Sequence, residues 1–235
     1  HEEILNKDEA IEKKAEHKKY GLITVAAGDG IKKMFEDLRC DVVIGGGQTM
    51  NPSTEDFVSA VRSLNCDHIL ILPNNSNIIL AAQQAADVLE DQDIQVFPTK
   101  TIPQGLSACI LFNPDADLET NLAEMNEAIA STKSGEVTYA VRDTTIDGLE
   151  VRAGEFMGIA GKKIVTCVPD MMNAAKNLLD SMLDEDSEVV TLIYGEDALK
   201  EQAEALESYI TDKCDAEVEV VNGKQPVYSF IMGVE

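Results

Sequence analysis

The sequence predicts an α/β domain of two lobes, with a mostly parallel sheet in the first lobe and a mixed sheet in the second. From Tyr20 onward, short apolar runs alternate with amphipathic stretches, which is typical of βα units in a parallel sheet. Near Lys133 this pattern gives way to short strands joined by polar turns that contain glycine, which favours antiparallel pairing. We therefore expect a boundary between the lobes near residue 133.

The first lobe, residues 20–132, is predicted to be Rossmann-like. Asn51 and Pro52 mark the start of one of its helices, as a cap and a first-turn proline do. Strands are expected over residues 21–27, 41–44, 68–72 and 94–97, and helices over residues 30–38, 52–64, 78–89, 108–113 and 118–131.

The second lobe, residues 133–235, is predicted to be a mixed α/β unit, and Asp147-Gly148 marks a hairpin turn in it. The charge-dense residues 1–19 are interpreted as a linker or helix that enters from an upstream domain. In the second lobe, strands are expected over residues 136–142, 149–151, 156–159, 164–168, 188–194, 216–221 and 227–234, and helices over residues 171–183 and 198–211.

The composition excludes several classes of function. The 43 acidic and 19 basic residues give a net charge of −24, which repels nucleic acid and anionic membranes. No apolar run approaches the ~20 residues that span a bilayer, and the charged first 19 residues do not resemble a secretory signal. The five cysteines lack CxxC spacing, which indicates reduced thiols and no zinc site. We therefore expect a cytoplasmic protein. Its acidic surface is interpreted as a solvated surface, with a basic partner as the alternative.

Polar residues collect after three predicted strands, in loops 45–53, 73–77 and 98–105. In a parallel sheet these strand ends share one edge, where ligands and partners bind. Ordinary turn chemistry is the alternative explanation of each loop. The amide and hydroxyl groups suit a carboxylate, a neutral polar group or the backbone of a partner, and the candidate binding or docking residues are Gln48, Thr49, Asn51, Ser53, Asn74, Asn75, Asn77, Thr99 and Gln104.

No catalytic or metal-binding residue can be assigned from the sequence. The glycine-rich loop 45–53 lacks the lysine of a phosphate-binding Walker A loop and the GxGxxG spacing. Of the three histidines, only His68 lies in the predicted folded body, as a structural or exposed residue, and it offers no catalytic relay. We therefore expect no cofactor in this chain.

Four ordered motifs carry a resemblance to a known family: GGGQTMNPST (45–54), LPNNSNI (72–78), PTKTIPQG (98–105) and YAVRDTTIDG (139–148), together with the terminal GKQPVYSFIMGVE. They resemble the C-terminal region of the fatty acid kinase A subunit. That family is dihydroxyacetone kinase-like and is often labelled DAK2 or DhaL-domain. The resemblance covers nearly all of residues 20–235.

The resemblance implies a domain with the fold of DegV-like fatty-acid-binding proteins, which is non-catalytic by itself. ATP and magnesium would be bound by an upstream DhaL-like domain of the full-length kinase. The partners implied are those upstream kinase domains and a separate fatty-acid-binding carrier subunit, whose bound fatty acid is converted to an acyl-phosphate. Homodimerisation stays open.

The segment 49–53 is similar to the loop with which DegV-like carriers hold the fatty acid carboxylate. Those carriers also use a C-terminal histidine and a Gly-Gly-Arg arginine, and neither is found here, since the corresponding end reads Gly223-Lys224-Gln225-Pro226. We therefore expect a docking domain for the carrier subunit. The alternative is a DegV-like protein that binds a fatty acid or small carboxylate, and a dihydroxyacetone-type kinase is a weaker alternative.

Overall fold

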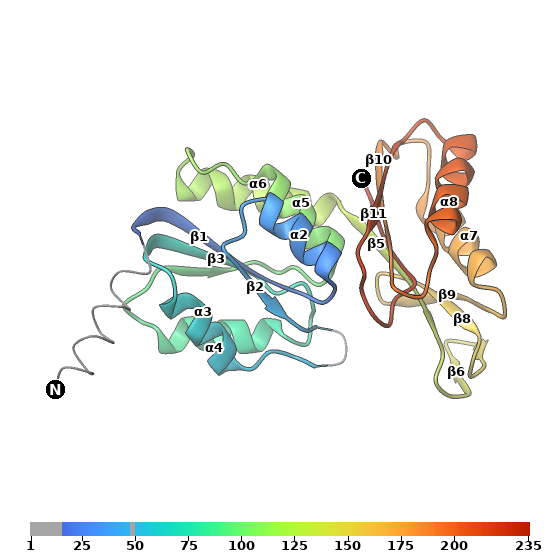
Figure 1. Ribbon diagram of the computed structural model, residues 1–235, viewed down its shortest axis with the longest axis horizontal. Helices are drawn as coiled ribbons and strands as arrows, with labels where there is room; N and C mark the ends of the chain where they lie inside the picture. The colour runs from blue at the N-terminus through green and yellow to red at the C-terminus, as the bar shows by residue number, and fades with distance from the viewer. Residues whose placement is uncertain (1–15, 48–49) are drawn as a thin grey trace.

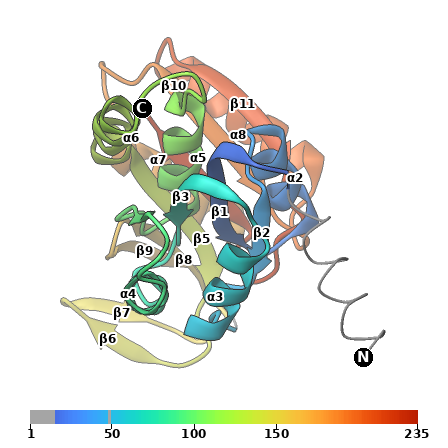
Figure 2. The same ribbon diagram turned by 90° about the vertical axis from the view of Figure 1, so that its left-hand side faces the viewer.

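A computed structural model of the chain describes residues 16–47 and 50–235, and these form two lobes. Figure 1 shows the first lobe as a sheet between two layers of helices, and the second lobe as a sheet with helices on its outer face. Figure 2 views the molecule from the side of the first lobe. The predicted two-lobed α/β fold, with one parallel and one mixed sheet, is confirmed.

The sheet of the first lobe has the strand order β2-β1-β3-β4, and each pair of neighbours is parallel. Its central strands carry long apolar runs because helices cover both faces. These strands are β1 (Lys18–Ala26), β2 (Val42–Gly45), β3 (Cys66–Leu72) and β4 (Ile94–Val96).

Five helices cover this sheet. On one face lie α2 (Asp29–Asp37), α5 (Ile102–Leu111) and α6 (Leu118–Ser131), and on the other lie α3 (Thr54–Arg62) and α4 (Ile79–Val88). The helices on each face enclose an apolar core whose members include Phe35 and Phe57, both fully buried. The carboxyl ends of the strands point toward the second lobe.

The sheet of the second lobe has the order β11-β10-β12-β5-β8-β9 and is antiparallel except for the β10–β11 pair. Helices α7 (Met171–Met182) and α8 (Lys200–Lys213) pack on its outer face, which leaves the other face to the first lobe. The strands are β5 (Lys133–Tyr139), β8 (Phe156–Ala160), β9 (Lys163–Val168), β10 (Val189–Tyr194), β11 (Glu217–Asn222) and β12 (Phe230–Val234), and a small hairpin is formed by β6 (Thr144–Ile146) and β7 (Leu149–Val151).

Three elements begin at residues other than the predicted ones. The predicted helix 108–113 begins instead at Ile102, because Thr101 caps it and Pro103 fits its first turn. Strand β1 begins at Lys18, within the segment interpreted as a linker, because Lys18 pairs in register with Cys66. Residues 1–15 of that segment lie outside the described residues. Strand β12 begins at Phe230 rather than at Val227, whose φ of 69° does not fit a strand.

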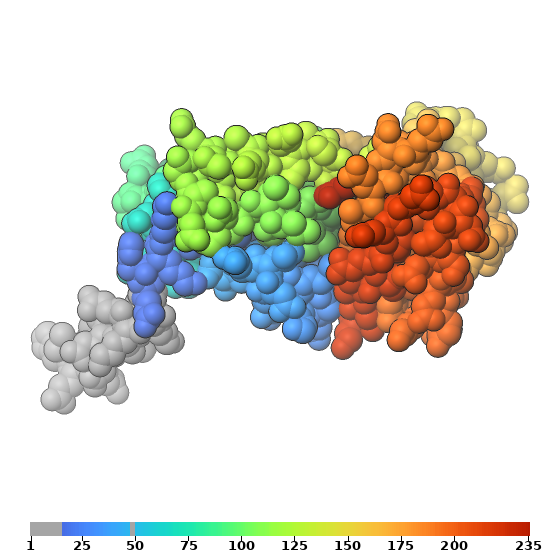
Figure 3. Space-filling view, turned by 90° about the horizontal axis from the view of Figure 1, so that it is seen from above, coloured from blue at the N-terminus to red at the C-terminus, as the bar shows by residue number. Residues whose placement is uncertain are grey.

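The two lobes are joined by a backbone contact at the start of α2. The residue before this helix is Gly28, which has no side chain for capping, and the backbone N–H groups of Gly30 and Ile31 donate instead to the carbonyl oxygen of Gly223. Ile193 and Ile231 of the second lobe also belong to the apolar core of the first. Figure 3 shows the second lobe, in orange and red, packed directly against the first.

Among the described residues, no helix combines the length and the apolar character that crossing a membrane requires.

Candidate functional site

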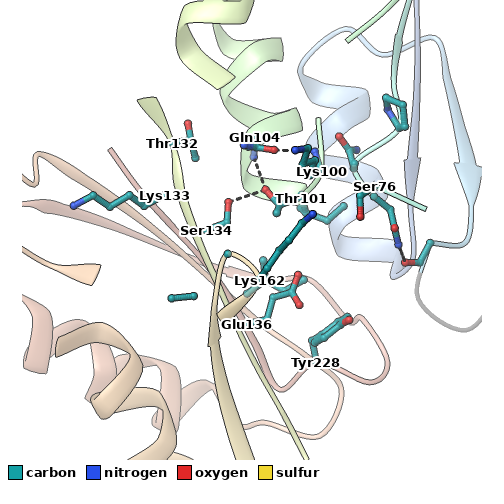
Figure 4. Close-up of a pocket in the computed structure, with 18 of the residues that line it drawn as sticks. Ser76, Lys100, Thr101, Gln104, Thr132, Lys133, Ser134, Glu136, Lys162 and Tyr228 are labelled. Carbon is teal, nitrogen blue, oxygen red and sulfur yellow. Dashed lines mark hydrogen bonds between the residues drawn. The ribbon is translucent and has the colours of Figure 1, made fainter. Parts of the chain in front are cut away.

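A cavity of about 570 Å³ lies between the lobes, at the carboxyl edge of the first sheet (Figure 4). One wall comes from the loops that follow β2, β3 and β4, and the opposite wall comes from β5, the turn between β8 and β9, and the segment before β12. Its volume falls within the range typical of small-molecule sites.

The three polar loops predicted from the sequence meet at this cavity. The lining includes Gly46 and Gly47 from the first loop, Asn74, Asn75 and Asn77 from the second, and Gln104 from the third. The Asn75 side chain holds the first two loops together, since its Nδ2 donates to the Gly47 carbonyl oxygen at 2.6 Å. The loops therefore form one continuous wall.

Asn74 and Thr99 are internal ties of this wall. Asn74 is buried and has a φ of 62°, a left-handed conformation that asparagine tolerates better than most residues. Its Nδ2 donates to Thr24 Oγ1 at 2.7 Å and to the Val25 carbonyl oxygen at 3.0 Å. Its backbone N–H donates to Oγ1 of Thr99, which is fully buried. These contacts join the ends of β1, β3 and β4.

Asn77 and Gln104 shape their own loops. The backbone N–H of Asn77 donates to Asn75 Oδ1 at 2.8 Å, which closes a turn at the start of α4. Gln104 lies in the first turn of α5, and its Oε1 accepts a hydrogen bond from the Lys100 backbone at 2.8 Å. Both residues line the cavity.

Five of the predicted residues do not line the cavity or cannot be placed, and the buried Thr99 is one of them. Asn51 and Ser53 are exposed and do not line it. Ser53 is the N-cap of α3, where its hydroxyl accepts from the Asp56 N–H at 3.2 Å and the Asp56 carboxylate accepts from the Ser53 N–H at 2.8 Å. Gln48 and Thr49 lie outside the described residues.

The wall from the second lobe was not predicted. Ser134 and Glu136 alternate along β5 with Gly135 and Val137, and the latter pair faces α7 and the core of the second lobe. Ser134 also meets the first lobe, because its hydroxyl lies 2.6 Å from the Thr101 hydroxyl. The alternation of polar and small or apolar residues in Ser-Gly-Glu-Val-Thr is a period-2 signal that indicates a strand with a polar face.

Three lysines give the cavity a positive character within a strongly acidic chain. Lys133 forms an ion pair with Asp184 at 2.7 Å. Lys100 and Lys162 come from opposite lobes, and neither forms an ion pair with a described residue. Figure 4 shows Lys162 reaching from the β8–β9 turn toward the loops that carry Lys100 and Ser76. An anionic group bound here would contact both lobes.

Glu136 is the one carboxyl group among the described residues that line the cavity. Burial raises its pKa to about 7, and the neighbouring Tyr228 hydroxyl offsets part of that rise. Burial, together with the Glu136 carboxylate, in turn raises the pKa of Tyr228 to about 12. The Glu136 carboxyl group can therefore gain or lose a proton near neutral pH.

The described residues show a site suited to binding. They contain no group of three His, Cys, Asp or Glu side chains that could hold a metal ion. The cavity wall supplies ammonium, amide and hydroxyl donors together with apolar surface from Val25, Ile102, Met182 and Ile231. Such a mixture fits a ligand with one anionic end and one aliphatic part.

By fold, the chain is a two-lobed domain of the DegV type. It is similar to protein TM841 from Thermotoga maritima, whose structure is described as revealing a fatty acid binding function, with 14% sequence identity, a TM-score of 0.69 and coverage of 93% of this chain and 99% of that chain. It is also similar to the DegV family protein Cg2579 from Corynebacterium glutamicum, with 16% identity, a TM-score of 0.67 and coverage of 92% and 96% of the two chains.

By sequence, the chain belongs to the FakA-like C-terminal family, the C-terminal region of proteins that are like the A subunit of fatty acid kinase, and the match covers residues 21–235. It is 54% identical over 217 residues to protein YloV of Bacillus subtilis, covering 92% of this chain and 39% of that protein. It is 43% identical over 237 residues to the uncharacterized protein SAUSA300_1119 of Staphylococcus aureus, covering 100% of this chain and 43% of that protein. The chain thus spans about two fifths of the length of these relatives.

Proposed function

We propose that this domain binds a fatty acid or a related aliphatic carboxylate in the cavity between its lobes. The observation that carries the proposal is the cavity itself, where Lys100 and Lys162, which pair with no described carboxylate, stand beside an apolar lining. Support comes from the fold, because several structures with this fold are described as fatty-acid-binding proteins. This is the alternative function expected from the sequence, and the geometry favours it over docking alone.

The cavity walls carry two kinds of side chain, which suit the two parts of a fatty acid. Lys100 and Lys162, with the hydroxyl groups of Ser76 and Thr101, provide donors for the carboxylate. Ile102, Met182 and Ile231 provide the apolar contacts for the aliphatic chain, at about 0.8 kcal/mol for each buried CH₂ group. The carriers' histidine and arginine, which this chain lacks, would thus be replaced by the two lysines.

The test is binding of a fluorescent fatty acid to the 235-residue chain and its displacement by unlabelled decanoate. Replacing both cavity lysines, as Lys100→Ala with Lys162→Ala, should weaken decanoate binding by at least about tenfold, because each charge-assisted hydrogen bond is worth about 1.5–3 kcal/mol. The matched control is Lys32→Ala, on the exposed surface of α2, which should bind as the unmodified chain does. Equal binding by the double variant and the control would refute the site.

A second function, docking of a separate fatty-acid-binding protein, is favoured by apolar side chains exposed near the β6–β7 hairpin. Val141 is 84% exposed, Tyr139 50% and Ile146 40%. Figure 1 shows this hairpin extending away from the body of the second lobe. Exposed aromatic and aliphatic side chains on a projecting hairpin and on the chain that leads into it are typical of protein interfaces.

Docking would be measured by titrating the chain with a DegV-type carrier protein. The variant Val141→Glu should weaken that association and leave decanoate binding unchanged, because the residue does not line the cavity. Thr145→Glu, which adds the same charge to an exposed strand residue of the hairpin, controls for charge alone. Association that Val141→Glu does not alter would exclude this surface.

We further propose that phosphoryl transfer belongs to the remainder of the longer protein, where an upstream DhaL-like domain would bind ATP and magnesium. The support is the partial coverage of the relatives and the family itself, which is described as the C-terminal region of a kinase-like protein. The chain by itself should not hydrolyse ATP or phosphorylate dihydroxyacetone. Turnover of either substrate by the purified chain would contradict this assignment.

A further inference from the structure

The cavity contains a feature that fatty acid binding does not require, a carboxyl group in the wall of a site proposed to hold an anion. Glu136 lies on β5, in register with Ile231 on β12 and Ile159 on β8, and its side chain faces the first lobe. It is half-buried and forms no ion pair with a described residue. A ligand carboxylate in the same cavity would meet a second negative charge if Glu136 were ionised.

The groups that face Glu136 can be named from each surrounding element. Tyr228, in the segment before β12, lies beside it, and Lys162 extends from the β8–β9 turn. Lys100 contributes from the β4–α5 loop of the first lobe. On its own strand, Lys133 is paired with Asp184. Its register neighbours on β8 and β12 are isoleucines, which carry no charge.

We propose that Glu136 couples ligand binding in this cavity to the uptake of a proton, so that an anionic ligand is held beside a neutral carboxyl group. The inference rests on the proposed function of the cavity. The proton comes from solvent and is held on the Glu136 carboxyl group. The protonated group can donate a hydrogen bond to a ligand oxygen, whereas the ionised group can only accept one.

Geometry and charge support the same conclusion. The Glu136 carboxylate and a ligand carboxylate in one partly desolvated cavity repel each other, which favours a proton on one of them. Burial has already brought the pKa of Glu136 to about 7, so protonation near neutral pH costs little. The ligand carboxylate, next to the lysines, remains the ionised partner.

The first measurement is calorimetric titration of the chain with decanoate at pH 7.5, in buffers of different ionisation enthalpy. We expect uptake of about 0.5–0.8 proton per ligand, and an affinity that falls about tenfold from pH 6 to pH 8 as the neutral fraction of Glu136 falls. Decanol, which carries no charge, should bind without proton uptake.

Glu136→Gln should bind decanoate without proton uptake and with little pH dependence. Glu124→Gln, an exposed position on α6, is the matched control and should behave as the unmodified chain does. Proton uptake that persists in Glu136→Gln would overturn the assignment, and so would decanoate binding without uptake in the unmodified chain. If decanoate does not bind at any pH, the proposed function itself fails, which is a separate outcome.

A direct readout covers the case in which Glu136→Gln does not fold. Carbon-13 NMR of the side-chain carboxyl groups follows the titration of Glu136 in the unmodified chain, with and without decanoate. A rise in its pKa on binding supports the proposal, and an unchanged or lowered pKa overturns it.

Discussion

The carbonyl oxygen of Gly223 accepts the backbone N–H of Gly30 at 3.0 Å, so that the second lobe caps a helix of the first. The approach is so close that a Cβ atom on Gly30 would overlap the carbonyl oxygen of Asn222. The start of α2 is thus in direct contact with the end of β11 and the loop that follows it. The segment that begins at Gly223 thus has a structural role.

Gly30→Ala should destabilise the chain by about 2 kcal/mol or more, because the helix start and the β11–β12 loop must move apart. The direction of the change in the free energy of unfolding is informative. At a helix position with room for a side chain, replacing glycine by alanine usually stabilises a protein by up to about 1 kcal/mol. Urea denaturation measures the effect. Gly45→Ala is the control, because a Cβ atom there would meet nothing within 4 Å. A neutral or stabilising Gly30→Ala would show that the lobes adapt easily.

Ser53→Ala should lower the free energy of unfolding by about 1 kcal/mol, the usual value of a lost N-cap hydrogen bond. Binding of decanoate should not change, because Ser53 does not line the cavity. Ser59→Ala, on the exposed face of the same helix, is the comparison. If Ser53→Ala loses decanoate binding and Ser59→Ala does not, Ser53 belongs to the binding site, as the sequence predicts.

The stability of the unliganded chain should depend on pH through Glu136. Its pKa of about 7 exceeds the reference value of 4.5, so the folded state holds a proton that the unfolded state has released between these values. Stability contributed by this group is therefore present below pH 4.5 and is lost as the pH rises from 4.5 through 7, by about 3 kcal/mol in total.

The difference in the free energy of unfolding between Glu136→Gln and the unmodified chain separates the contribution of Glu136 from those of the other carboxyl groups. We expect the variant to gain relative stability from pH 5 to pH 8, as measured by denaturation at each pH. A difference that stays constant over this range would mean that Glu136 has an ordinary pKa.

Cys40 and Cys109 should resist alkylation in the native state, whereas Cys167 and Cys214 should react, and Cys66 should react more slowly because burial raises the pKa of its thiol. The first two are buried, with sulfur atoms 3.6 Å apart, and the other three are partly exposed. The contact with Cys109, together with burial, raises the pKa of the Cys40 thiol well above its usual range, which disfavours the reactive thiolate. Intact mass after brief iodoacetamide treatment counts the modified thiols. Five rapid additions would contradict the buried pair.

The alternation of apolar and amphipathic stretches was sufficient to predict the parallel sheet, the mixed sheet and the meeting of three polar loops. It could not show which side chains of those loops point outward. Asn74 and Thr99 are polar, and yet the N–H groups of Asn74 and the hydroxyl group of Thr99 hold strand ends together. Composition alone does not separate such internal hydrogen bonds from groups available to a ligand.

The half of the site that comes from the second lobe could not be predicted for a different reason. The strand that carries Ser134 and Glu136 has a polar face, but whether that face meets solvent or the first lobe depends on how the lobes pack. That packing rests on backbone contacts such as the one between Gly30 and Gly223, for which side-chain patterns give no signal.

The position of strand β12 has a consequence for the integrity of the second lobe. It follows every other strand in sequence, and yet it lies inside the second sheet, between β10 and β5. It is the strand that hydrogen-bonds to both halves of that sheet, and helices α7 and α8 pack across them in one apolar core. Loss of β12 would therefore separate the second sheet into two parts and would also remove Ile231 from the cavity wall.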